Sequence, residues 1–212
     1  MAEKDEITDG RRLRRLRTEE KLVAAVGALL HKGGVASLGV NAVAEQAGVE
    51  KVLVYRYFGD LDGLMTAWAA RSDFWPSIEE LIGEGGKDLR DRDKARVGAR
   101  VLANYARALR KRPVTLDLLA FECGYRNALT VALEEVREAR TRELFVALKE
   151  AGVPDLGELG ALFSAAINYL AVRGRDIRVF GGLGVHGDAD WEHIEEIILE
   201  VFRAMSRRAE RK

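Results

Sequence analysis

The sequence predicts an all-α protein of about nine helices, and three observations support this. Apolar residues in the long segments recur every three or four positions, with almost no strict alternation, which indicates helices rather than strands. Only three of the 212 residues are proline, and glycine or proline follows most of the periodic segments, as at helix ends. Apolar residues make up 48% and charged residues 32% of the chain, which is typical of a folded globular protein.

Charge and cysteine content exclude several classes of protein. The formal net charge is zero, so a nucleic-acid partner must be argued from local patches rather than from global charge. Cys123 is the single cysteine, which excludes an internal disulfide and a multi-cysteine zinc site. No apolar run approaches the length of a membrane span and the N-terminus is charged, so we expect a cytoplasmic protein with no membrane partner.

The chain is organised around the stretch from Gly39 to Leu64. Its first part has helical apolar spacing over residues 40–47, and Gly48 then offers the positive φ that ends a helix in a tight turn. The spacing resumes in a second helix of about two turns, over residues 51–58. The apolar positions of this pair are Val40, Val43, Ala44, Ala47, Val49, Val54 and Phe58. Together they predict a helix-turn-helix.

The second helix of the pair carries side chains suited to DNA. With Val54 and Phe58 facing inward, the opposite face shows Lys51, Val52, Tyr55 and Arg56. Basic groups meet phosphates or guanine edges, a tyrosine hydroxyl donates to a phosphate, and valine lies against a thymine methyl. The spacing alone is also compatible with a small helical hairpin whose basic face is solvated and binds no DNA.

At these residues the sequence resembles the TetR (tetracycline-repressor) family of bacterial regulators. The matching segments are VAEQAGV at residues 43–49, VYRYF at residues 54–58, and Leu64 in the next helix. The resemblance implies a three-helix DNA-binding domain, which we place at residues 1–60, and a larger helical domain for ligand binding and dimerisation at residues 61–212. The residues predicted to contact DNA are Lys51, Val52, Leu53, Tyr55, Arg56, Tyr57, Asn41 and Arg17.

Two departures from the family pattern concern phosphate contacts. The family usually has threonine where this chain has Leu53, and lysine where it has Leu61. In the family this threonine and this lysine commonly hold phosphates. We therefore expect fewer contacts to the DNA backbone here, partly replaced by contacts from arginines upstream.

The upstream arginines occupy the segment RRLRRLR, with five between Arg11 and Arg17. They follow a polar segment, residues 1–10, that we expect to be a frayed tail. The arginines are read either as the solvated start of a helix or as an arm along the phosphates or in a minor groove. The first helix then runs to about Lys32, with Leu22, Val26 and Leu29 facing the helix-turn-helix, and Asp60 is a plausible N-cap of the fourth helix.

The C-terminal part ends in two strongly apolar helical segments. Helices are expected over residues 88–112, from Pro113 to Gly124, and over residues 126–151. The last two segments, around 156–180 and from about 191 onward, flank a glycine-rich loop, GGLGVHGD. Their wide apolar faces predict a homodimer through the last two helices, and the alternative is a hairpin within one subunit. The resemblance implies that these helices pair with their partners as a four-helix bundle.

A ligand of the C-terminal domain would meet polar or aromatic groups among apolar helices. The candidates are Tyr105, Phe121, Cys123, Asn168 and Tyr169, although ordinary core or surface packing explains each of them as well. The expected ligand is a small, mainly apolar molecule. The resemblance implies that such a ligand acts by shifting the fourth helix, which changes the separation of the two recognition helices in the dimer.

Metal and enzyme chemistry receive little support from the sequence. His186, Asp188 and His193 lie close together, but a loop between two helices explains this segment more simply than a metal site. Cys123 is expected to be a buried, inert thiol, and no nucleophile–base pair follows from spacing. We expect no cofactor, no metal and no enzymatic activity.

Two functions remain at this stage. The first is a dimeric transcriptional repressor released from an inverted-repeat operator by a small ligand. The second is a helical small-molecule-binding protein or enzyme that has lost DNA reading, which Leu53 and Leu61 make conceivable.

Overall fold

The computed structural model describes the backbone of residues 2–153 and 157–209, and the side chains of residues 10–153 and 159–204. Over this part of the chain the protein has ten α-helices, two 3-10 turns and one short hairpin, so the all-α prediction is confirmed. The chain divides into two compact units. The first consists of Met1–Ser72 and Phe121–Val136, and the second of Asp73–Ala120 and Arg137–Lys212.

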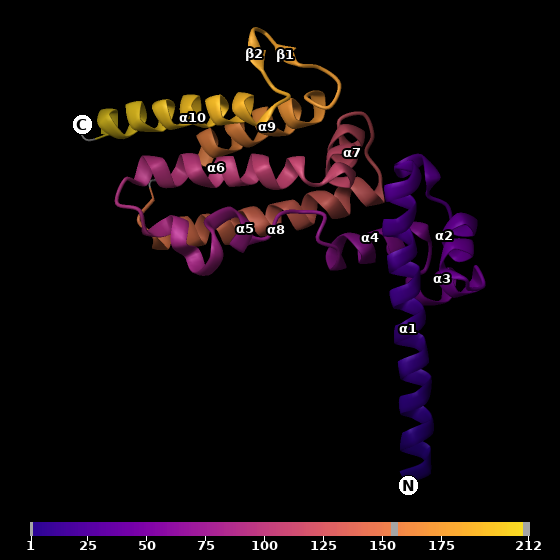
Figure 1. Ribbon diagram of the computed structural model, residues 1–212. Helices are drawn as coiled ribbons and strands as arrows, with labels where there is room; N and C mark the ends of the chain where they lie inside the picture. Colours follow the sequence, from indigo (N-terminus) through magenta and orange to yellow (C-terminus); the bar gives the residue numbers. More distant parts are fainter. Residues whose placement is uncertain (1, 154–156, 210–212) are drawn as a thin grey trace. The chain divides into compact units, whose positions relative to one another are not determined.

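The first unit is built around the long helix α1 (Ala2–Gly33), shown in indigo in Figure 1. A 3-10 turn, η1 (Val35–Ser37), leads to α2 (Val40–Ala47), α3 (Val52–Phe58) and α4 (Leu61–Arg71). Helices α2 and α3 lie beside the C-terminal half of α1, and its N-terminal half continues past them (Figure 1). The frayed tail predicted for residues 1–10 is wrong over residues 2–10, because these residues belong to α1, which runs from Ala2 through Gly10 without a break.

The core of this unit is made by apolar positions at helical spacing. Leu22, Val26, Val43, Val54 and Leu64 have no solvent-exposed side-chain surface. Leu22, Val26 and Leu29 are all buried, as the sequence predicts. The turn after α1 is held by Ser37, whose hydroxyl lies 2.8 Å from the Leu29 carbonyl oxygen and 2.7 Å from that of Gly34.

The junction between α3 and α4 leaves no room for a side chain at Gly63. A Cβ built there would lie 2.1 Å from the carbonyl oxygen of Phe58, the last residue of α3. Asp60 caps α4 as predicted, because its carboxylate accepts a hydrogen bond of 2.8 Å from the Gly63 amide. Helix α4 ends at Arg71, where the Ser72 amide donates to the Trp68 carbonyl oxygen.

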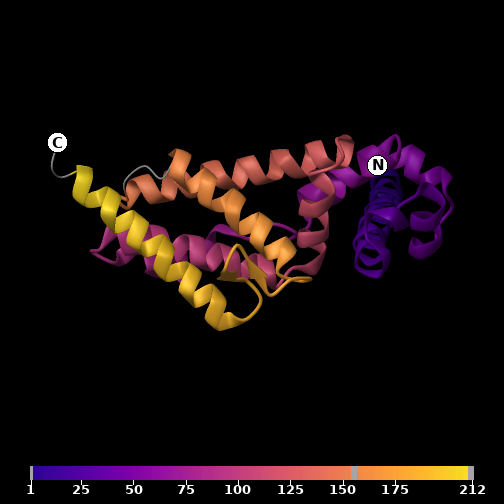
Figure 2. The same ribbon diagram turned by 90° about the horizontal axis from the view of Figure 1, so that it is seen from above.

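The second unit is a layered set of helices around α6 (Lys94–Arg110), which is preceded by α5 (Ile78–Ile82) and η2 (Glu84–Arg90). Helices α7 (Pro113–Glu122) and α8 (Ala128–Glu150) belong partly to each unit. Helices α9 (Gly157–Arg173) and α10 (Asp188–Ala209) pack on α6 (Figure 2). At the start of α6, Asp93 accepts a hydrogen bond of 3.1 Å from Arg203 of α10.

The glycine-rich segment between α9 and α10 is more ordered than the predicted loop. Helix α9 stops at Arg173, and the chain then forms an antiparallel hairpin from β1 (Val179–Phe180) and β2 (Leu183–Gly184). Gly181 and Gly182 make its two-residue turn with φ of 56° and 89°, a combination that two consecutive glycines adopt without strain. None of the described helices combines the length and apolar character needed to cross a membrane.

The close approach at Gly63 gives a test of the packing between α3 and α4. Replacing Gly63 with alanine forces the new methyl group onto the Phe58 carbonyl oxygen, so we expect a loss of about 1–3 kcal/mol in unfolding free energy. Gly10 is the control, because an added Cβ there meets nothing within 4 Å and alanine favours helix. Urea denaturation of both variants measures the difference, and equal stability of G63A and G10A would contradict this packing.

Candidate nucleic-acid interface

The turn between α2 and α3 is closed by Gly48 in the left-handed region, with φ of 65°. The Gly48 amide donates to the Glu45 carbonyl oxygen (3.1 Å), and the Val49 amide donates to that of Ala44 (3.0 Å). These two bonds form a Schellman motif, which satisfies the last carbonyl groups of α2 and reverses the chain. Helix α2 has the bounds predicted from the sequence, because its stop signal is a single local residue.

Helix α3 is held by one side and exposed on the other. Val54 is fully buried and anchors the helix, while Val52 and Tyr55 are 51% and 53% exposed. Lys51 and Arg56 are also exposed. The structure therefore brings Lys51, Val52, Tyr55 and Arg56 together at one short helix with their side chains in solvent, and we call these four residues the reading face.

The other predicted DNA contacts lie around the reading face at several places. Leu53 and Tyr57 of α3 are half-buried. Asn41 is exposed in the first turn of α2, and Arg17 is exposed on α1. Leu61, in the first turn of α4, is half-buried and offers no polar group.

An ion-pair cluster around the buried Glu19 was not predicted from the sequence. Arg15 of α1 donates to the Glu19 carboxylate (Nε–Oε1, 2.7 Å), and its guanidinium carbon lies 5.4 Å from the centre of the Tyr57 ring. Arg71 of α4 lies 3.9 Å from the other Glu19 oxygen. The bond to Glu19 and the charge of that carboxylate raise the pKa of Arg15. The only sequence signal was an Arg–Glu pair spaced by four, which is also common on solvated helix faces.

The predicted ligand residues fall into separate groups. Tyr105 of α6 is buried and donates a 2.6 Å hydrogen bond to the Asn168 side chain of α9. The ring of Tyr105 lies 5.6 Å from that of Trp75, which Arg137 also contacts. Tyr169 is exposed, and its ring meets Phe180 of the hairpin edge-on at 5.2 Å.

The two remaining ligand candidates belong to the first unit. Phe121 stacks on Tyr125 with ring centres 4.7 Å apart. The prediction that Cys123 is buried is wrong, because the residue is exposed. Helix α7 ends at Glu122, and the Gly124 and Tyr125 amides donate to the Phe121 carbonyl oxygen, which places Cys123 in a turn beyond the helix.

The histidines near the hairpin have partners of their own. His186 Nδ1 lies 2.8 Å from the Gly174 carbonyl oxygen, and His193 Nδ1 lies 3.4 Å from the Glu196 carboxylate. Asp188 pairs with Arg110 at 2.8 Å. Within the described residues, no group of three or more histidine, cysteine and acidic residues has the arrangement of a metal site.

A short, one-sidedly buried helix that follows a tight glycine turn defines this unit as a helix-turn-helix domain. Residues 22–67 match the family described as "Bacterial regulatory proteins, tetR family". The N-terminal domain therefore belongs to the TetR family, which confirms the resemblance. By sequence, no curated protein matches the chain.

Two solved structures show that the likeness in fold extends beyond the N-terminal domain. A TetR family transcription regulator from Marinobacter aquaeolei VT8 is 17% identical with a TM-score of 0.57, over 89% of this chain and 97% of that one. A TetR-like transcriptional regulator from Rhodococcus sp. RHA1 is 19% identical with a TM-score of 0.52, over 89% and 96%. The chain thus has the fold of these regulators over most of its length.

Two valines on α3 test the one-sided anchoring of this helix. Val54→Ala removes fully buried methyl groups, so we expect a loss of about 2 kcal/mol in unfolding free energy from lost burial and the cavity left behind. Val52→Ala changes an exposed residue and should alter stability by less than about 0.5 kcal/mol. Thermal and urea unfolding compare the two variants, and a larger loss from Val52→Ala would mean that the faces of α3 are assigned the wrong way round.

Proposed function

We propose that the protein is a dimeric, sequence-specific transcriptional repressor that a small, mainly apolar ligand releases from an inverted-repeat operator. The observation that supports DNA reading best is the reading face. Val52, Tyr55 and Arg56 stand in solvent on a helix of seven residues, with Lys51 directly before it, and the other side of the helix is anchored by Val54. A lysine and an arginine there suit phosphates and guanine edges, and Val52 suits a thymine methyl.

A dimer is needed because one such helix reads few base pairs. Each good bidentate contact discriminates by about 1–3 kcal/mol, so a single α3 gives little specificity. Two copies related by a two-fold axis double these contacts and match an inverted repeat.

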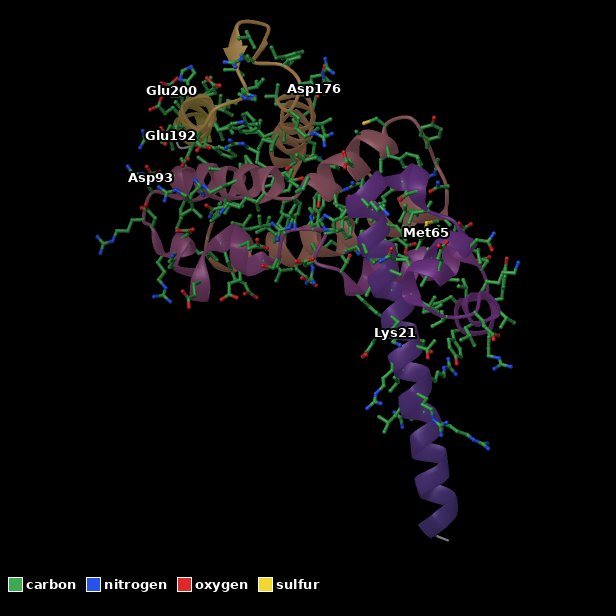
Figure 3. The ribbon with its side chains drawn as sticks, turned by 45° about the vertical axis from the view of Figure 1, so that its right-hand side comes forward. Lys21, Met65, Asp93, Asp176, Glu192 and Glu200 are labelled. Atoms are coloured by element: carbon green, nitrogen blue, oxygen red, sulfur yellow. The ribbon has the colours of Figure 1, made fainter. Side chains whose placement is uncertain are left out.

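The proposed dimer surface consists of the outer faces of α9 and α10. On α9 an apolar row is exposed: Ala161, Leu162, Ala165, Ala166 and Tyr169. Leu162 is 69% exposed, and Ile197 of α10 is 37% exposed. Small residues along such a row allow close helix packing, and a second copy would cover it as a four-helix bundle. The labelled Glu192 and Glu200 lie on the outer side of α10 (Figure 3), where they would lie at the rim of the bundle.

The proposed ligand contacts centre on Tyr105 and Asn168. Their hydrogen bond joins α6 to α9, and Tyr105 also meets Trp75, four residues beyond the end of α4. A ligand that changes the packing of Tyr105 would act on Trp75 and hence on the segment that follows α4. It would shift DNA affinity only as far as it binds the two conformations unequally.

Mobility shift or fluorescence anisotropy with DNA from upstream of the protein's own gene tests this function. Several phosphate contacts should make log K fall with log [salt] by about 0.9 per contact. Absence of salt-dependent binding would favour the second candidate, a helical protein that binds a small molecule but no longer reads DNA. Leu53 and the half-buried Leu61 favour that candidate, because neither supplies a phosphate donor.

Arg56→Ala should weaken specific binding about tenfold or more, because it removes an exposed guanidinium from the reading face. Glu45→Ala is the matched control, since Glu45 is exposed on the supporting helix α2. Anisotropy titrations with specific and scrambled duplexes compare the two variants. Equal losses would show that the reading face is assigned wrongly.

Leu162→Glu should dissociate the dimer, because it places a charge in the middle of the exposed row on α9. Val146→Glu is the control, as it adds the same charge at a 58% exposed apolar residue of α8. Sedimentation velocity over a concentration series measures the dimer dissociation constant. We expect it to rise at least 100-fold for L162E and to stay unchanged for V146E, and the reverse order would move the interface to α8.

A further inference from the structure

Among the described side chains, Glu19 of α1 is the only charged residue that is buried. A carboxylate withdrawn from water is costly unless ion pairs and hydrogen bonds compensate for the loss of hydration. Its side chain is 10% exposed and faces two arginines. Because burying a carboxylate costs free energy, the residues that pair with Glu19 show which parts of the structure it stabilises.

The partners of Glu19 join three helices, α1, α3 and α4, at one point. Arg15 of α1 binds one carboxylate oxygen through Nε and lies over the ring of Tyr57 in α3. Arg71 in the last turn of α4 approaches the other oxygen at 3.9 Å. A single carboxylate therefore links α1 to α4 directly and to α3 through Arg15.

Arg15 differs from the neighbouring Arg11, Arg12 and Arg17 in its partners and not in its exposure, because all four are exposed on α1. The charge of Arg15 is balanced by Glu19 at 2.7 Å, and one face of its guanidinium is occupied by the Tyr57 ring. A guanidinium over an aromatic face is attracted to it, by about 0.5–1 kcal/mol at exposed sites and more when desolvated.

We propose that Glu19 and Arg15 are positioning residues for the reading face. Glu19 orients Arg15, and Arg15 fixes Tyr57, which sets the orientation of α3 against α1. The surrounding arginines then contact phosphates, while Arg15 does not. This inference rests on the proposed function, since it concerns how the DNA-reading helix is held.

The salt dependence of DNA binding separates positioning from direct contact. Losing one phosphate contact lowers the slope of log K against log [salt] by about 0.9. Arg12→Ala is the matched control on the same helix and should lower the slope by that amount. Arg15→Ala and Glu19→Gln should weaken binding about five- to thirtyfold at the wild-type slope.

A double-mutant cycle with Tyr57→Leu tests the route through the ring. The losses from Arg15→Ala and Tyr57→Leu should be non-additive by at least threefold, because each change breaks the same contact. The fold-losses in DNA affinity from Arg12→Ala and Tyr57→Leu should multiply in the double variant, which means that their free energies add. A reduced slope for R15A, or additivity with Y57L, would overturn the proposal and make Arg15 an ordinary phosphate contact.

Hydrogen exchange without DNA gives a measurement that does not depend on the proposed function. Amides of residues 52–58 should exchange at least fivefold faster in R15A and E19Q than in the wild type and R12A. Amides of α10 should be unchanged, which excludes general unfolding. If the wild type binds no duplex, the proposed function fails and this measurement still decides the positioning role. Unchanged exchange in residues 52–58 would overturn it.

Discussion

The structure of the N-terminal unit depends on how a helix of seven residues is held. Helix α3 is too short to be stable in water by itself, so its conformation depends on packing. Val54 supplies that packing on one side, and the residues on the opposite side stay in solvent. Because a helix repeats every 3.6 residues, anchoring at one position decides which others face outward. The exposure of Lys51, Tyr55 and Arg56 is thus a consequence of the burial of Val54.

Glycines at both ends of α3 make this anchoring possible. Gly48 reverses the chain in a conformation that a side chain would strain, and Gly59 ends the helix with φ of 84°. Gly63 then lets α4 approach the last carbonyl group of α3. The chain thus enters and leaves α3 in fixed directions. In our proposal, the ion pairs of Glu19 then hold the orientation of α3 against α1.

The sequence predicts what is local in this fold. Helix α2 and its stop follow from apolar spacing and one glycine, and the Asp60 cap follows from its position before an apolar run. The hairpin was missed although Gly181-Gly182 between apolar residues carried its signal. The ion pair of the buried Glu19 with Arg71 joins residues fifty-two positions apart, and the exposure of Cys123 depends on where α7 ends. Contacts of this kind leave no periodic pattern in the sequence.

The predicted assignments to ligand and dimer surfaces rest on tertiary contacts and stay predictions. Asn168 and Tyr169 are neighbours in the sequence, yet the first bonds to Tyr105 and the second faces solvent beside the hairpin. The domain boundary placed after residue 60 also stays a prediction. By compactness, α4 clusters with the first unit, which also includes residues 121–136. Helix spacing places residues on a face, but it does not say which neighbouring element covers that face.

The central claim is that two copies of α3, one from each subunit of a dimer, contact one DNA duplex through their solvent-exposed sides. Hydroxyl-radical footprinting on DNA from upstream of the gene tests this claim most directly. Two protected segments should appear, related by a two-fold axis and separated by whole helical turns of about 10–10.5 base pairs, so that both lie on one face of the DNA. Protection of a single segment, of opposite faces, or of no segment at concentrations where the protein is dimeric would contradict the account.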